Sequence, residues 1–126
     1  MRKELIICIV IIVGIIAGDL LLQNYTNKSL DSINEKLLNL KADIKQNDYF
    51  DMDKINEIDK EWNQGFDILT CFLEHEELEK IKTQLVIISS GMEMEDRDYV
   101  YEEIDRAVYI IDHIEQKQML KLDNIL

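Results

Sequence analysis

The sequence predicts an all-α protein in which an N-terminal transmembrane helix is followed by a small antiparallel bundle of about four helices. The first reason is an almost uninterrupted apolar run from Leu5 to Leu22, which approaches the roughly 20 apolar residues that a membrane-spanning helix needs. The second is that the remaining chain repeats apolar residues at steps of three and four and contains no proline, as amphipathic helices do.

The 126 residues divide into four expected segments. These are a cytoplasmic stub (1–4), a transmembrane anchor (5–22), an interface linker (23–28) and an acidic extracytoplasmic bundle (29–126). Arg2 and Lys3 set the orientation, because positive charge beside a membrane helix stays in the cytoplasm. A cleaved signal peptide would begin in the same way, but three leucines follow Asp19 where a signal peptide turns polar. We therefore expect an uncleaved, single-pass protein of the cell membrane with its C-terminal domain outside.

The net charge argues against a nucleic-acid partner. Arg2 and Lys3 balance Glu4 and Asp19, so the formal charge of −12 belongs entirely to the chain beyond the anchor. Such an excess repels phosphate, and we expect no nucleic-acid partner.

The two cysteines are expected to remain unpaired. Cys8 lies in the apolar run and Cys71 is alone in the polar part, so no disulfide forms within the bundle. Free cysteines are among the most buried residues, and burial is the expectation for Cys71; a link between two copies is the alternative.

The anchor itself carries candidate contact residues. Gly14 and Gly18 have the spacing that lets two membrane helices approach closely, although glycine is also simply common in such helices. Asp19 is a carboxylate near the end of the run, and such groups face a partner, a cavity or the interface. Lipid and a membrane or envelope protein, or a second copy, are therefore the expected partners.

Two amphipathic helices are predicted first after the anchor. One runs from Ser29 to Ile44, and the membrane helix can continue into it because no glycine or proline intervenes. The other runs from Met52 to Leu73, with Asp48 or Asp51 as its N-cap. Their predicted core positions are Leu30, Ile33, Leu37, Leu40, Ile44, Met52, Ile55, Ile58, Trp62, Phe66, Leu69 and Leu73. Trp62 is the expected core anchor, and Gly65 marks a slight bend or a close helix approach.

Two further helices complete the expected bundle. One begins in the acidic run from Glu74 to Glu77, which suits a helix N-terminus, and Gly91 is expected to end it in the left-handed conformation. The other is capped by Asp96 or Asp98, and a short apolar tail from Met119 is expected to pack back onto the bundle. Their predicted core positions are Leu78, Ile81, Leu85, Ile88, Val100, Ile104, Ala107, Ile111 and Ile114. The break before the third helix has the weakest signal, and an open helical hairpin is the alternative architecture.

No catalytic motif is present. His75 opens a segment similar to the zinc-protease helix, but Glu79 stands where the second histidine is required. One metal hypothesis remains, in which His75, His113 and Glu76, with Asp112 nearby, meet at one end of the bundle. Surface histidines in an acidic field are the simpler interpretation, so no cofactor and no enzymatic activity are expected.

Several short segments resemble a known family. They are Arg2-Lys3, Glu61-Trp62, His75-Glu76-Glu77, Asp112-His113-Ile114 and the tail from Leu120 to Leu126. On these, the chain resembles over its full length domain-of-unknown-function family 4363, short membrane-anchored helical proteins of endospore-forming Gram-positive bacteria. The resemblance implies a bacterial, anchored and extracytoplasmic protein and brings no activity with it. The loop from Ser89 to Glu95 departs from the family in being longer and richer in methionine.

The expected function is that of a membrane-tethered helical module outside the cytoplasm, an accessory or interaction protein without catalysis. The alternative is a sensor-like bundle that binds a small ligand or a metal through Trp62, His75 and His113. A ligand site needs polar groups that point into the core, and the apolar stripes predict none.

Overall fold

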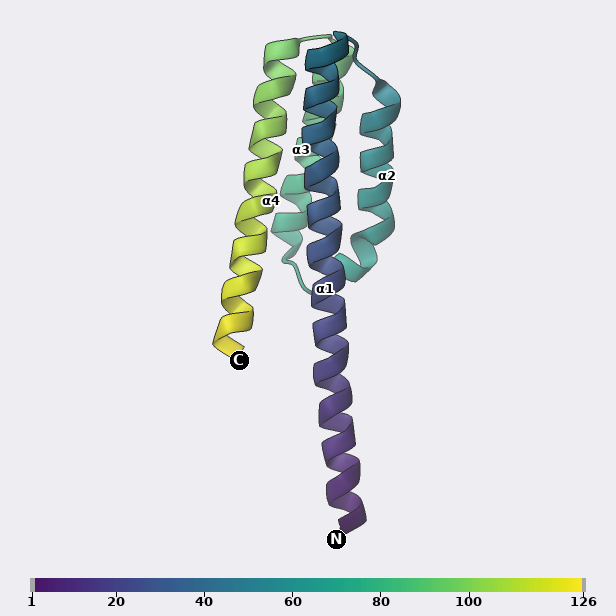
Figure 1. The fold of residues 1–126 in the computed structure, drawn as a ribbon, viewed down its shortest axis with the longest axis vertical. Helices are drawn as coiled ribbons and strands as arrows, with labels where there is room; N and C mark the ends of the chain where they lie inside the picture. Colours follow the sequence, from purple (N-terminus) through teal and green to yellow (C-terminus); the bar gives the residue numbers. More distant parts are fainter. Residues whose placement is uncertain (1, 126) are drawn as a thin grey trace.

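A computed structural model describes residues 2–125, with side chains described for residues 2–120. Over this range the chain forms α1 (Arg2–Asn47), α2 (Met52–Leu69), α3 (His75–Glu93) and α4 (Arg97–Ile125). The helices run alternately up and down (Figure 1), and α1 and α3 occupy opposite corners, each packed against both α2 and α4. The predicted all-α class, with a long apolar helix leading into a small bundle, is confirmed.

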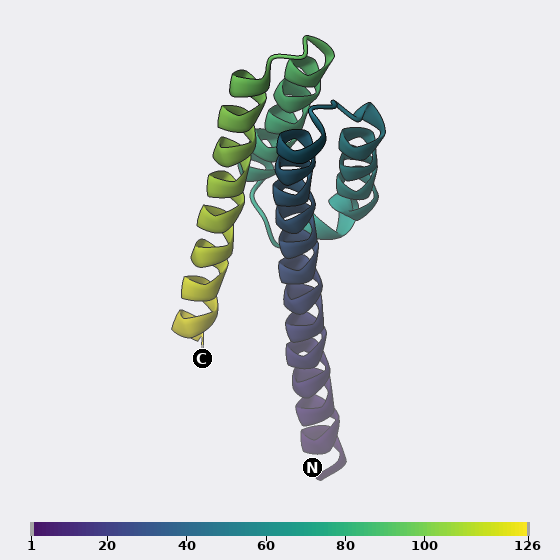
Figure 2. The same cartoon turned by 45° about the horizontal axis from the view of Figure 1, so that its top comes forward.

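The longest helix, α1, is unbroken over 46 residues and serves both parts of the protein. Residues 23–28, expected to be a linker, are helical as well, because no glycine or proline interrupts the chain between Gly18 and Ile44. The N-terminal half protrudes from the bundle (Figure 2), and its large apolar side chains are exposed. Within the described residues, α1 is the helix whose length and composition are sufficient to cross a membrane.

The bundle core lies where the spacing of apolar residues predicts it. Trp62 is 1% exposed and is the largest buried side chain. The other buried apolar residues are Leu30, Ile33, Leu37, Leu40, Ile44, Ile55, Ile58, Leu69, Leu73, Leu78, Ile81, Leu85, Ile88, Met92, Val100, Ile104, Ala107, Ile111 and Ile114. Met52 and Phe66, also predicted, are partly buried against this cluster. Because all four helices contribute to one cluster, the open hairpin alternative is wrong.

The first two turns follow local sequence signals. Asp48 ends α1 in the left-handed region at φ 53°, and Asp51 caps α2 by accepting a hydrogen bond of 3.1 Å from the amide of Asp53. The break before the third helix is confirmed, and α3 begins at His75. The predicted end of the second helix at Leu73 is wrong, because α2 ends at Leu69 and Leu73 lies in the following turn, where its side chain is buried and its amide donates to the Leu69 carbonyl at 2.9 Å.

The predicted end of the third helix is wrong. Gly91 is helical, α3 continues to Glu93, and the left-handed residue is Glu95 at φ 54°. The amides of Glu95 and Asp96 donate to the carbonyls of Met92 and Gly91, each at 3.1 Å, which is the Schellman arrangement that closes a helix C-terminus. The role of Gly91 is close packing, because a Cβ there would lie 2.8 Å from Tyr99 Cδ1 and 3.0 Å from Val100 Cγ2.

The start of the fourth helix has one of its two predicted caps. Asp96 accepts a hydrogen bond of 3.3 Å from the amide of Tyr99, whereas Asp98 lies within the first turn. The helix then continues to Ile125 rather than giving way to a tail. The predicted packing of Ile125 and Leu126 onto the bundle lies outside the described side chains.

Two other expectations concern Cys71 and Gly65. Cys71 is exposed, contrary to prediction, because the turn that carries it buries Leu73 instead. Gly65 faces α1, but a Cβ there would lie 3.6 Å from the hydroxyl of Tyr25, an ordinary contact distance, so the packing does not require glycine.

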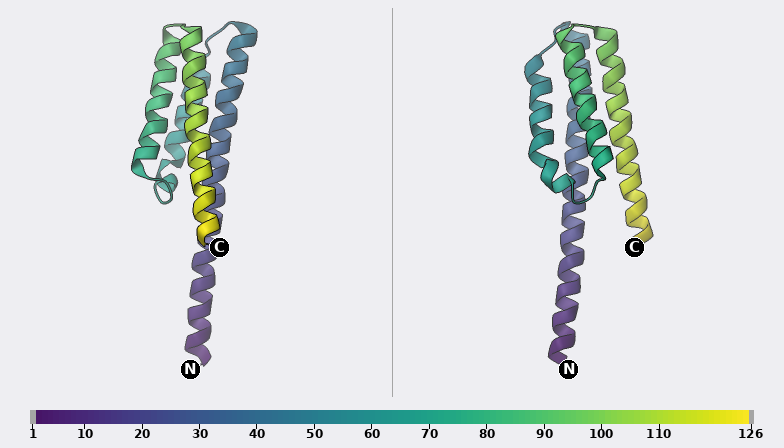
Figure 3. Two further views of the ribbon diagram at one scale, coloured as in Figure 1. Left: turned by 90° about the vertical axis from the view of Figure 1, so that its left-hand side faces the viewer. Right: turned by 180° about the vertical axis from the view of Figure 1, so that it is seen from behind.

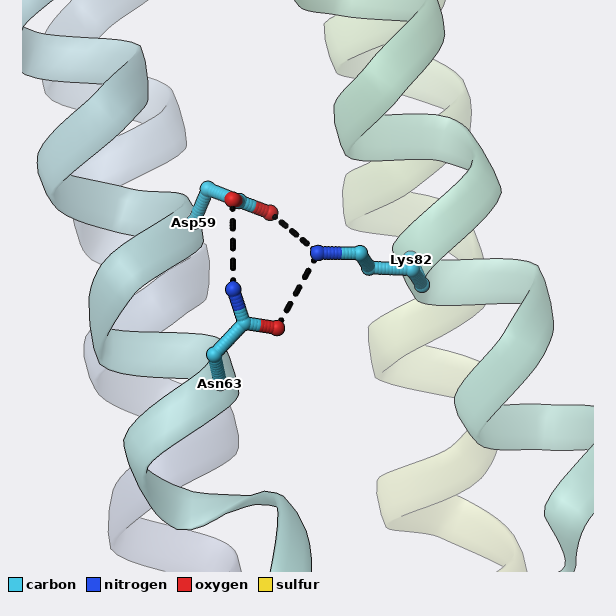
Figure 4. A network of polar contacts seen from close by, with 3 residues as sticks. All are labelled: Asp59, Asn63 and Lys82. Carbon is cyan, nitrogen blue, oxygen red and sulfur yellow. Dashed lines mark hydrogen bonds and ion pairs between the residues drawn. The ribbon is translucent and has the colours of Figure 1, made fainter.

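Each neighbouring pair of helices is joined by a lysine and a carboxylate. The pairs are Lys36–Glu61 between α1 and α2 (2.7 Å), Lys82–Asp59 between α2 and α3 (3.0 Å), Lys117–Glu77 between α3 and α4 (2.9 Å) and Lys41–Asp105 between α1 and α4 (2.7 Å). Lys82 also donates to Asn63 at 3.0 Å (Figure 4). Exposed ion pairs contribute only about 0–1 kcal/mol each, so they specify which helices are neighbours more than they stabilise the fold.

The two bundle glycines provide a matched test of helix packing. Gly91→Ala should lower the free energy of unfolding by about 1–3 kcal/mol, because the new methyl group meets the fixed side chain of Val100. Gly65→Ala meets only ordinary contacts and should raise it by up to about 1 kcal/mol through helix propensity. Thermal unfolding of the full chain in detergent, followed by circular dichroism, measures both. Equal stability of the two variants would contradict the proposed packing role of Gly91.

Candidate functional site

The predicted contact residues of the anchor lie on the protruding half of α1. Gly14 and Gly18 are four residues apart, so they share one helix face, and a Cβ built on either meets no atom within 4 Å. Asp19 is exposed and lies about 100° around the helix axis from Gly18. These residues therefore form an open surface that the chain itself does not cover.

The predicted metal residues are only partly brought together. A pocket of about 230 Å³ between α3 and α4 contains His113 and Glu76, but His75 lies outside it and faces Glu79, with Nε2 3.4 Å from Oε1. Asp112 turns to α1, where it accepts a hydrogen bond of 2.8 Å from Asn34. Within the described part of the chain, no three His, Cys, Asp or Glu side chains lie close enough together to hold a metal ion.

A lysine already occupies one of the carboxylates in this pocket. Lys80 and Lys117 line it, and Lys117 Nζ donates to Glu77 at 2.9 Å. The hydrogen bond that Lys117 donates to Glu77 raises the pKa of Lys117, with further contributions from the charges of Glu77, Glu74 and Glu76. His113 stacks on Tyr109, with ring centroids 6.4 Å apart. Glu77 is therefore already paired with Lys117 and is not free to bind a metal.

The core holds polar groups that the apolar stripes did not predict. Gln84 and Glu103 are buried between α3 and α4, and Gln84 Nε2 donates to the Glu103 carbonyl at 3.0 Å. Gln118 donates to the Phe72 carbonyl at 3.2 Å, and Thr26 donates to the Leu22 carbonyl at 3.0 Å. These bonds hold helices and turns together, whereas Trp62 Nε1 and the Tyr101 hydroxyl are shielded from solvent without a hydrogen-bond partner among the described residues.

The burial of Gln84 and Glu103 could have been predicted from the sequence. Gln84 follows the core residue Ile81 by three positions, and Glu103 follows Val100 in the same way. Residues three apart share a helix face, so a wider predicted buried face on each helix would have included both residues.

A second feature that the sequence did not reveal is an acidic seam between α1 and α4. Glu115 packs against Asp31 and lies near Asp112, and its Oε1 atom is shielded from solvent without a hydrogen bond from the described residues. Burial, followed by the hydrogen bond to Asp31 and the charges of Asp31 and Asp112, raises the pKa of Glu115 to about 8. Near neutral pH Glu115 is therefore mostly protonated, which reduces the charge repulsion with Asp31 and Asp112 where α1 and α4 meet.

A comparison with protein families gives one match. The model of a domain of unknown function, DUF4363, matches residues 20–125, which cover the whole described bundle and leave out Arg2, Lys3 and most of the apolar run. No curated protein and no solved structure matches the chain.

The acidic seam predicts a pH dependence of stability. Folding raises the pKa of Glu115 from its ordinary value of 4.5 to about 8, so between these values the folded chain keeps a proton that the unfolded chain releases. The free energy of unfolding should therefore fall as pH rises through this window. Glu115→Gln keeps a hydrogen-bond donor without the charge, and at pH 8 it should be more stable than the wild type by on the order of 1 kcal/mol, since solvent screens the pair.

Melting temperatures of the full chain in detergent between pH 5 and 8.5 measure this effect. Glu102→Gln, which changes an exposed glutamate on the same helix, serves as the control and should keep the wild-type slope. An unchanged slope in Glu115→Gln would show that the Asp31–Glu115 contact does not control stability.

The pocket between α3 and α4 predicts that zinc does not bind. The melting temperature of the full chain should stay the same when zinc is added, because Lys80 and Lys117 compete for the carboxylates and His75 lies outside the pocket. A rise that disappears in His113→Ala would contradict this and restore the metal hypothesis.

Proposed function

We propose that this chain, which belongs to the DUF4363 family of domains of unknown function, is a single-pass membrane protein whose helical bundle binds another membrane or envelope protein, or a second copy, without catalysis. The observation that carries the proposal is α1, a single helix whose first half is apolar and uncovered and whose second half is one corner of the bundle. A surface that one chain leaves uncovered in this way requires lipid or a partner around it.

The orientation follows from the flanking charges. Arg2 and Lys3 precede the apolar run, and no positive charge follows it until Lys28, so the N-terminus lies in the cytoplasm and the bundle outside. In an endospore-forming Gram-positive bacterium, as the family resemblance implies, this side of the membrane faces the cell envelope. The acidic bundle then meets proteins or polymers of the envelope.

The continuity of α1 favours a role in transmitting contact. Residues 23–28 are helical, so the boundary between the two halves contains no flexible linker. A rotation or tilt of the membrane segment therefore reorients the whole bundle. A partner that binds the exposed face around Gly14 and Gly18 would thereby set the position of the bundle at the membrane surface.

Two observations favour an interaction role over an enzymatic or ligand-binding one. The buried side chains of Gln84 and Glu103 are paired with each other. The pocket that contains His113 has lysines on its walls. The alternative of a small-ligand or metal-binding bundle therefore ranks second.

Crosslinking in intact membranes tests the proposal. We expect chemical crosslinking and mass spectrometry to recover a membrane or envelope protein, or a dimer of this chain. Replacing Gly14 and Gly18 with leucine should reduce that product several-fold, because the larger side chains keep two helices apart. Ile12→Leu with Ile16→Leu has the same spacing on the opposite helix face and is the matched control, expected to leave the product unchanged.

Recovery of neither a partner nor a dimer would refute the interaction role. A product that survives the double glycine replacement would instead place the contact on the bundle, away from the apolar segment.

A further inference from the structure

The register between α1 and α4 fixes how far the end of α4 reaches. Lys41 lies beside Asp105, Asn34 beside Asp112, and Asp31 beside Glu115. Each step along α1 is matched by an equal step in the opposite direction along α4. Toward the C-terminus of α4, Gln118 and Met119 line one small cleft with Gln23, Thr26 and Asn27 of α1. The same register between the two helices therefore holds in this region.

The same register places the end of α4 at the end of the apolar run. α4 is helical to Ile125, and an equal step brings that residue level with Leu21. The last turns of α4 are therefore level with residues 21–27 of α1, where the apolar run gives way to polar sequence. Figure 1 and the right view of Figure 3 show α4 extending past the α2–α3 turn and leaning away from α1 toward its C-terminal end.

The depth of this segment matches the lipid headgroup layer. A bilayer has a hydrocarbon core of about 30 Å and a total thickness of about 40–45 Å, which leaves roughly 5–7 Å of headgroups on each side. Residues 23–27 of a helix rise about 7 Å. If the hydrocarbon core ends near Leu22, the headgroup layer contains both residues 23–27 of α1 and the end of α4. Tyr25 then lies in this layer, as aromatic residues of membrane proteins often do.

Side chains at the end of α4 suit such a layer. Met119 and Leu120 are 62% and 63% exposed, next to each other on a helix whose other large apolar residues are mostly buried in the bundle. Apolar side chains beside a membrane surface insert at the boundary between headgroups and acyl chains. A protein partner is a weaker interpretation for this pair, because lipid surrounds α1 at the same depth.

We propose that the C-terminal end of α4 is a second membrane contact, in which Met119 and Leu120 enter the headgroup layer of the leaflet from which α1 emerges. The proposal rests on the membrane span assigned to α1 under the proposed function. Two contacts, one spanning and one on the surface, hold the bundle at a defined angle to the membrane, whereas α1 alone leaves the bundle free to tilt.

Depth-dependent fluorescence quenching tests this contact. In the full chain, Cys8→Ser and Cys71→Ser remove the two exposed thiols, and a nitrobenzoxadiazole label is attached after Leu120→Cys. The protein is reconstituted in phosphatidylcholine vesicles, whose lack of net charge avoids repulsion of the acidic bundle. We expect blue-shifted emission and at least two-fold stronger quenching by lipid with a nitroxide at the headgroup than by lipid with one at the acyl-chain end.

Two further labelled positions make the result decisive. Tyr109→Cys labels a residue of α4 that is 72% exposed and about 16 Å further from the membrane along the helix; its label should be unquenched by either lipid. Ile12→Cys labels the middle of the proposed span and should be quenched most by the deep nitroxide. If the label at position 120 behaves like that at 109 while that at 12 is quenched, the surface contact is wrong and the span stands.

Two other quenching results would overturn the membrane span or the surface contact. No quenching at position 12 overturns the span and, with it, the proposed function. Deep quenching at position 120 overturns the assignment to the headgroup layer, because it would place the end of α4 in the hydrocarbon core.

Discussion

The unbroken course of α1 is the constraint on which the rest of the structure depends. A helix interrupted by glycine or proline at residues 23–28 would make the anchor and the bundle two bodies joined by a linker. Here the backbone hydrogen bonds continue through that boundary, so the face that α1 presents to the bundle also fixes the orientation of its uncovered apolar half. Gly14 and Gly18 on one side and the core residues Leu30 and Ile33 on the other are fixed in angle by the same helix.

The polar contacts between helices determine register, whereas the apolar core supplies most of the stabilisation. Burial of an aliphatic side chain contributes about 1.5–3 kcal/mol, and an exposed ion pair contributes about 0–1 kcal/mol. Sliding one helix along another by a turn would still bury leucine and isoleucine, but it would separate Lys41 from Asp105 and Asp31 from Glu115. The acidic seam therefore matters mainly because it fixes where α4 ends relative to α1.

Much of the fold could be predicted from the sequence, because periodic apolar residues dictate which helix faces are buried. The core positions, the cap at Asp51 and the start of α3 at His75 follow from local patterns. Gly91 and Cys71 could not be predicted, since each depends on tertiary neighbours. Gly91 is required by contact with Tyr99 and Val100 on another helix. Cys71 is exposed because the turn buries Leu73.

The contacts of the candidate metal residues were harder to predict, again because they depend on tertiary neighbours. Pairing of His75 with His113 was inferred from the end of the bundle at which each lies, but side-chain direction around a helix decides contact, and it separates them. Glu115 has no sequence signature, because its raised pKa arises from burial between two helices and then from Asp31, which is far away in the chain.

A distance measurement along α1, between its apolar half and its bundle half, tests whether the helix is continuous. Spin labels at Ile16 and Leu38, both exposed and nearly on one helix face, should lie about 33 Å apart if the helix is unbroken. Pulsed electron paramagnetic resonance of the full chain in a lipid bilayer measures this separation. The account predicts a single narrow distribution at that distance; a broad or much shorter distribution would place a hinge at residues 23–28 and contradict it.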